Sequence, residues 1–364
     1  MDASQLADLH EPRPFPAVSI VMPTHRRLPE RRQDQVRLKV LLDEARHRLR
    51  ELELERGTAD ELMRHLEKAA EQVDFDHTAE ALVLLAAHGG ETHSFILPRV
   101  NVRERVIIDD TFATRDLVAM LETTWRYWVL ALAKQTRLLS GDGLRIEEVN
   151  NALFPLAYTE AVPVPDERGK PAPREFPVEN ERRMQFLRQV GQNLTETLKR
   201  DTRPVVVIGV QRHVTSFLEG VATTNTLAES VIGTVEGGFS TATPAEIATI
   251  VAPVLQEEHE RAQRRALEEL DGARSSRRFA SGLEECWELA GTGRVAHLLV
   301  EEDYIVPART EEGRLHPADS AEGKYVNDAV DDLIEMVLRT DGKVTFVPDE
   351  TLAESDRVAA VLRY

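Results

Sequence analysis

The sequence has almost no cysteine and no long apolar run. Cys286 is the only cysteine among the 364 residues, so an intrachain disulfide is excluded. The longest apolar runs, residues 81–87, 128–133 and 205–210, are far shorter than the roughly 20 residues that a membrane-spanning helix needs. Residues 1–8 lack the basic and apolar regions of a signal peptide. We therefore predict a cytoplasmic protein that does not contact a membrane.

Positive charge is also scarce. Lys and Arg number 45 against 63 Asp and Glu, which gives a formal net charge of −18. This charge argues against broad electrostatic binding of nucleic acid, and DNA is excluded as a partner on that ground. A local basic face on an acidic body remains compatible with it. A hydrophobic content of 42% is that of a globular protein, and the length predicts two or three domains.

The strongest local pattern lies in the middle of the chain. Residues 205–210 form a short run rich in β-branched side chains, which is typical of a strand buried on both faces. A helical spacing follows around Phe217, and residues 230–235 resemble a second short strand. Strand, helix and strand in that order predict a βαβ-like unit around which other elements pack.

Alternation of helical and strand patterns continues along the whole chain, so we predict an α/β fold with three domains. The first eighteen residues, with three prolines, are expected to form a loose arm. A proline-rich segment at 158–177 predicts an exposed loop, because its composition cannot bury a core. The predicted domains are residues 1–108, 109–250 and 251–364.

Five stretches, taken in order, resemble the middle and C-terminal domains of the archaeal and eukaryotic class 1 release factor and Pelota superfamily. They are Arg203–Gly209, Ser230–Glu236, Gln256–Leu270, Ser281–Asp303 and Val358–Tyr364. Two further stretches, Ser19–Arg26 and Gln33–Lys39, resemble the bacterial branch of that superfamily, whose first domain is divergent. The resemblance implies an RNase-H-like middle domain and an α-β-α third domain of the kind found in kink-turn-binding ribosomal proteins.

The chemistry of release factors does not follow from this resemblance. Release factors hydrolyse peptidyl-tRNA with a Gly-Gly-Gln loop, which by order should fall within Tyr158–Asn180. That segment has one glycine, Gly169, and no glutamine. The first domain also lacks the Asn-Ile-Lys-Ser motif that the family uses in stop-codon reading. A conventional termination activity is therefore rejected.

Residues 26–50 hold the only dense positive excess, nine Lys and Arg against four acids. We interpret it as a surface for the phosphates of ribosomal RNA or tRNA. The candidate contacts are Arg26, Arg27, Arg31, Arg32, Arg37 and Lys39. Four such contacts would weaken binding by roughly two orders of magnitude for a fivefold rise in salt. The alternative is a solvated helix face with pairs such as Glu44 with Arg48.

Catalytic and metal sites are not predicted. Asp109, Asp110, Asp116 and Glu122 could form the carboxylate cluster of an RNase-H-like nuclease, although nothing in their spacing fixes such a geometry. The histidines show no ligand spacing with each other or with Cys286. No cofactor is expected.

The sequence therefore predicts a translation-associated, non-catalytic factor that binds the ribosome or tRNA in rescue or hibernation. Two alternatives stay open. One is a hydrolase or metal-dependent nuclease built on the middle domain. The other is a protein-interaction module, with the segment 158–177 as the loop that binds a protein partner.

Overall fold

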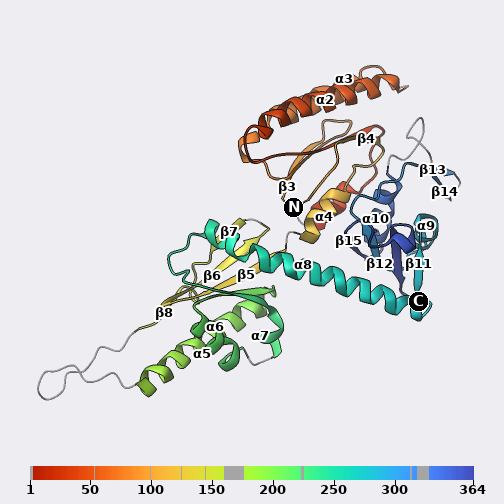
Figure 1. Ribbon diagram of the computed structural model, residues 1–364. Coiled ribbons are helices and arrows are strands. Elements are labelled where there is room, and N and C mark those ends of the chain that lie inside the picture. The colour runs from red at the N-terminus through yellow and green to blue at the C-terminus, as the bar shows by residue number, and fades with distance from the viewer. Residues whose placement is uncertain are drawn as a thin grey trace, which may run out of the picture. The chain divides into compact units, whose positions relative to one another are not determined.

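The structure is a computed structural model (Figure 1). It describes residues 3–52, 54–98, 100–123, 125–143, 145–159, 176–222, 225–311, 314–317 and 328–364. Two compact units divide the chain. Met1–Thr123 together with Ala262–Tyr364 form unit 1, and Thr124–Arg261 form unit 2. The α/β class is confirmed, and each of the three predicted domain ranges holds one main sheet. Their boundaries at 108 and 250 stay a prediction.

The N-terminal part of unit 1 is an antiparallel sheet in the order β3-β2-β1-β4. Its strands are β1 (Ala17–Pro23), β2 (Ala81–Ala86), β3 (Thr92–Leu97) and β4 (Arg105–Asp109). Two helices, α2 (Glu30–Glu51) and α3 (Thr58–Glu71), cover one face. A short 3-10 helix (Phe75–His77) follows α3. Every residue of β2 is buried, which agrees with its continuous apolar sequence.

The first eighteen residues differ from the prediction. They contain a helix, α1 (Ala3–Leu9), and not only a loose arm. Leu6 and Leu9 are buried and belong to the hydrophobic core of unit 1. Three prolines at positions 12, 14 and 16 drew the prediction toward an irregular segment, but the helix ends before them.

The C-terminal part of unit 1 has a sheet in the order β11-β16-β12-β15. Its strands are β11 (Phe279–Ser281), β12 (Val295–Glu301), β15 (Lys343–Val347) and β16 (Val358–Leu362). The remaining elements are α9 (Leu283–Gly291), α10 (Ala329–Arg339), the hairpin of β13 (Ala308–Glu311) and β14 (Arg314–Pro317), and a 3-10 helix (Ala353–Ser355). Helix α4 (Arg115–Thr123) also lies in this unit, although the predicted middle domain, residues 109–250, includes it.

Unit 2 is built on a sheet in the order β10-β9-β5-β6-β7, with β8 paired to β6. The strands are β5 (Arg126–Leu132), β6 (Gln135–Asp142), β7 (Arg145–Glu148), β8 (Leu156–Ala157), β9 (Val205–Gly209) and β10 (Val231–Glu236). Three neighbouring strands on one side of the sheet, β10, β9 and β5, run parallel. All five residues of β9 are buried, and the predicted strand-helix-strand unit is confirmed.

Helices cover both faces of this sheet. On one face, α5 (Phe176–Arg200), α6 (Gln211–Gly220) and α7 (Asn225–Ser230) bury one apolar cluster. On the other face lies the first part of α8 (Pro244–Ser275), which buries Ile247, Val251 and Leu255. Pro253 sits inside α8, and the helix continues past Arg261 into unit 1. Within the described residues, none of the helices is both long and apolar enough to cross a membrane.

Candidate functional site

The six cations predicted to contact RNA lie on the loop before α2 and on the first three turns of that helix. Three of the six candidate cations form ion pairs within unit 1. Arg26 pairs with Glu80 at 3.2 Å, and Arg31 pairs with Asp76 at 2.9 Å. Arg37 lies 2.7 Å from Glu104 and 3.3 Å from the fully buried Asp34. Since these charges are already compensated, they are less available to phosphates than the sequence suggested.

The other three candidates, Arg27, Arg32 and Lys39, are exposed. None of them forms an ion pair with another described residue. Two exposed valines, Val36 at 63% and Val40 at 60%, lie among them on the outer face of α2. Arg32, Val36 and Lys39 follow the three- and four-residue spacing of one helix face. The structure therefore brings together a small surface that is part cationic and part apolar.

The carboxylates considered for a nuclease site are engaged separately in unit 1. Asp116 forms an ion pair with Arg105. Glu122 accepts a hydrogen bond from the backbone N–H of Phe346 at 2.9 Å, and burial raises its pKa to about 7. Asp109 accepts from the N–H of its neighbour Asp110. Across the described residues, no group of three acidic, His or Cys side chains could hold a metal ion.

A pocket in unit 2, which the sequence analysis did not predict, lies where strands β5 and β9 end. These strands are parallel neighbours, with Leu132 paired to Gly209 at their carboxyl ends. Ligands of open α/β sheets commonly bind at this edge. The pocket has a volume of about 80 Å³. Its described lining residues are Leu132, Ala133, Lys134, Thr136, Tyr158, Arg183, Phe186, Leu187, Arg212 and His213.

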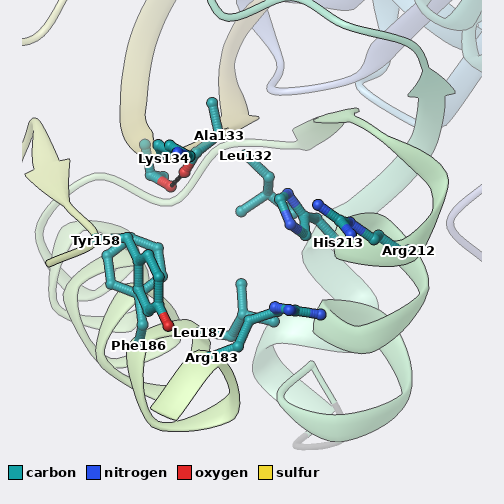
Figure 2. Close-up of a pocket in the computed structure, with 10 residues that line it drawn as sticks. Leu132, Ala133, Lys134, Tyr158, Arg183, Phe186, Leu187, Arg212 and His213 are labelled. Atoms are coloured by element: carbon teal, nitrogen blue, oxygen red, sulfur yellow. Dashed lines mark hydrogen bonds between the residues drawn. The ribbon is translucent and has the colours of Figure 1, made fainter. Parts of the chain in front are cut away.

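Figure 2 shows how the side chains surround this space. Arg212 and His213 come from the first turn of α6, and Arg183 approaches from α5. The rings of Tyr158 and Phe186 pack edge to face on another wall, with their centroids 5.4 Å apart. Because β9 ends at Gly209 and α6 begins at Gln211, only Val210 separates strand from helix. This short turn holds Arg212 and His213 at the sheet edge.

The pocket is strongly positive. None of its ten described lining residues is acidic, and Lys134, Arg183 and Arg212 are cations at neutral pH. Burial, together with the positive charges of Arg212 and Arg183, lowers the pKa of His213. No side chain caps the N-terminus of α6, whose first N–H groups add positive potential. The described lining therefore favours an anion over a cation.

One sequence signal could have located this pocket. The buried strand predicted at residues 205–210 is followed directly by three polar residues, Gln211, Arg212 and His213. Polar residues after a buried parallel strand often bind ligands. The sequence could not have shown that Arg183 lines the same pocket, because Arg183 lies on another helix, α5, 29 residues before Arg212. The predicted loop at 158–177 lies outside the described residues except at its ends.

A second buried set of ionisable groups lies on α10 in unit 1. Asp331 and Glu335 are 5% and 3% exposed. Burial, and then the charge of Asp331, raises the pKa of Glu335 to about 10. Burial and the charge of Asp328 raise the pKa of Asp331 to about 7. Because both pKa values lie above their ordinary range, these two carboxyl groups release their protons at higher pH than exposed carboxyl groups do.

Comparison with known proteins finds one family model that matches the middle of the chain. Residues 126–294 match the family model described as bacterial archaeo-eukaryotic release factor family 3. The matched segment contains the whole sheet of unit 2 and its cationic pocket. A search of curated proteins finds no match.

Several solved structures are similar along the chain. An archaeal translation termination factor, aRF1, is 17% identical, with 100% of this chain and 97% of that chain covered and a TM-score of 0.26. A ribosome-bound archaeal Pelota with ABCE1 is 14% identical, with 99% and 93% covered and a TM-score of 0.44. Dom34 of S. cerevisiae, a translation termination-like factor that interacts with Hbs1, is 14% identical, with 76% and 73% covered and a TM-score of 0.42.

At these identities and TM-scores the solved structures add no argument about function. The family match is independent of them. It contains three of the stretches that carried the resemblance in the sequence, Arg203–Gly209, Ser230–Glu236 and Gln256–Leu270, and part of a fourth, Ser281–Asp303. The resemblance to the bacterial branch of the release factor and Pelota superfamily is confirmed for this segment: residues 126–294 match the model of bacterial archaeo-eukaryotic release factor family 3.

Proposed function

We propose that the protein is a translation-associated factor that binds the ribosome in a rescue or hibernation setting and does not hydrolyse peptidyl-tRNA. The observation that carries the proposal is the release-factor family match over residues 126–294. The chain has no Gly-Gly-Gln sequence at any position. A factor of this architecture without that motif would occupy a ribosomal site without releasing the nascent peptide.

The exposed cations of α2 supply a contact surface for this role. Arg27, Arg32 and Lys39 are exposed and pair with no other described residue. On a chain with a net charge of −18, such a surface would orient the protein toward RNA while the rest of the body is repelled. Val36 and Val40 add exposed apolar surface. Its burial in the complex would stabilise binding in addition to the phosphate contacts.

The test is co-sedimentation of the purified full-length protein with ribosomes from its own host, at low and at fivefold higher salt. Three phosphate contacts predict that the association constant falls by roughly 30- to 80-fold over that range. Ribosomes from growing and from starved cells would be compared, because a hibernation factor prefers the latter. Peptidyl-tRNA hydrolysis would be measured in the same samples.

A charge-matched control is available in unit 1. Replacing Arg27, Arg32 and Lys39 with Glu should abolish pelleting. The same charge change at Arg56, Arg64 and Lys68, which are also exposed, should leave most of it intact. No pelleting with either ribosome preparation would contradict the proposal. Release of the nascent peptide by the bound protein would contradict its non-catalytic part.

A further inference from the structure

We propose that the cationic pocket of unit 2 is a binding site for a single terminal phosphate group, carried by a small phosphate compound or by the end of an RNA strand. The site consists of Arg183, Arg212, His213, Lys134 and Tyr158. It is distinct from the surface on α2 and does not rest on ribosome binding.

Charge is the first argument. Neither Arg183 nor Arg212 forms an ion pair with a described residue, and the pocket lining contains no acidic side chain. Acidic residues are abundant in this chain, at 63 against 45 basic ones. In such a chain, cations gathered around one cavity repel one another unless an anion lies between them.

Geometry is the second argument. Arg183 reaches the cavity from α5, whereas Arg212 and His213 reach it from the first turn of α6. Two planar guanidinium groups that approach from different helices can bind different oxygens of one tetrahedral anion. The uncapped N-terminus of α6 adds backbone donors on the same side. A carboxylate has two oxygens and one charge, so it would use fewer of these donors than a phosphate dianion.

Size limits the ligand. The pocket measures about 80 Å³, whereas pockets that enclose whole small molecules span roughly 300–1,000 Å³. The cavity therefore accommodates one phosphate group, and the rest of the ligand remains outside. Tyr158 also lines the pocket, and its ring and hydroxyl are available to the group that follows the phosphate.

The electrostatic state of His213 provides a direct reporter. Burial and the charges of Arg212 and Arg183 lower its pKa. A phosphate dianion beside the ring would reverse that effect and raise the pKa, because it favours the imidazolium form. A histidine far from the bound phosphate would not respond in this way.

The experiment is NMR titration of the His213 ring in the full-length protein, with the signal assigned by its loss in His213→Gln. The probes are inorganic phosphate, a 5′-phosphorylated oligoribonucleotide, and the same oligonucleotide with a 5′-hydroxyl. A rise in the His213 pKa with inorganic phosphate alone supports the small-phosphate source. A rise in the His213 pKa with inorganic phosphate and with the 5′-phosphorylated oligonucleotide, but not with the 5′-hydroxyl form, supports the RNA-end source.

Variants complete the test. Arg183→Gln and Arg212→Gln should each weaken phosphate binding by about 10-fold or more, since each removes a charge-assisted hydrogen-bond donor. Arg188→Gln changes an exposed residue of the same helix outside the pocket and should change nothing. No response of His213 to any phosphorylated probe would overturn the proposal. An equal response to the 5′-hydroxyl probe would also overturn it, because internal phosphodiesters would then suffice.

Discussion

The carboxylate of Asp331 caps a helix that lies 216 residues earlier in the chain: its Oδ1 accepts a hydrogen bond from the backbone N–H of Arg115 at 2.7 Å. The N–H of Thr114 donates to the same carboxylate, 3.1 Å from Oδ2. The Arg115 side chain in turn forms a buried ion pair with Asp328 at 2.9 Å. The first backbone N–H groups of α4 are thus satisfied by Asp331 of α10, and the Arg115 side chain is held by Asp328, which directly precedes α10.

Replacing Asp331 with Ala at pH 6 should therefore lower the free energy of unfolding by about 1–3 kcal/mol, because two buried backbone donors lose their acceptor. Asp331→Asn keeps an acceptor oxygen and should stay close to the wild type. Urea unfolding measures the difference. Hydrogen exchange at the Thr114 and Arg115 amides should accelerate in the Ala variant only. Equal stability of Ala and Asn would show that the cap contributes nothing.

Glu335 should make unit 1 less stable as the pH rises. Its folded-state pKa of about 10 lies above the ordinary 4.5, so between these values the folded protein holds a proton that the unfolded chain has released. The contribution of Glu335 to the free energy of unfolding is fully present below pH 4.5. It decreases as the pH rises from there and is lost as the pH passes 10. The slope is roughly 1.4 kcal/mol per pH unit.

Glu335→Gln removes this dependence. The stability of the variant relative to the wild type should increase by about 2 kcal/mol between pH 7 and pH 8.5. This comparison avoids His10, whose pKa is lowered to about 4 by burial and by Arg339 and which therefore affects stability only at lower pH. Parallel stability curves for the two proteins would refute the assignment.

Gly141 should not tolerate a side chain. It pairs across the sheet with Tyr127, and a Cβ at this position would overlap the Tyr127 ring. That ring is only 1% exposed, so it has little room to move. Gly141→Ala should lower the stability of unit 2 by about 1–3 kcal/mol. Gly238→Ala, where a Cβ meets nothing within 4 Å, is the matched control, and thermal unfolding compares the two.

Cys286 should be chemically silent in the folded protein. It is fully buried, and burial raises the pKa of its thiol to about 12. Because the thiolate is the reactive form, iodoacetamide at pH 8 should modify the native protein only as fast as unit 1 opens. Mass spectrometry would follow the single adduct, with protein in guanidinium chloride as the reactive control. Rapid modification without denaturant would contradict the buried position.

The two kinds of cation on α2 should behave differently. Arg32→Gln should reduce the salt dependence of ribosome binding by about 0.7–0.9 in the logarithmic slope and leave stability unchanged. Arg37→Gln should instead cost about 1.5 kcal/mol of stability, because Arg37 pairs with the fully buried Asp34. Circular dichroism melts and salt-dependent sedimentation of the same two variants separate these roles. A reduced slope in Arg37→Gln with unchanged stability would reverse the assignment.

The sequence predicted most elements because their patterns are local. The buried run of β9, the helical spacing around Phe217 in α6 and the short run of β10 required no tertiary information. The candidate site was predicted only in part. Ion pairs of Arg26 and Arg31 depend on Glu80 and Asp76, whose approach is decided by the fold. The pocket in unit 2 forms where α5 and α6 pack beside the ends of β5 and β9. No periodic pattern in the sequence predicts how these helices pack.

Unit 1 cannot be completed until the last part of the chain has been synthesised. Its two segments, Met1–Thr123 and Ala262–Tyr364, are separated by the whole of unit 2. At roughly 5–20 residues per second, a nascent chain carries Arg115 for on the order of ten seconds or more before Asp328 and Asp331 exist. During that interval the apolar side chains of Val83 and Phe112, which belong to a core shared with Leu298 and Ile334, have no C-terminal partners. The chain is therefore most vulnerable to aggregation while it is still being made, and a chaperone that covers this sheet face would be needed only for that time.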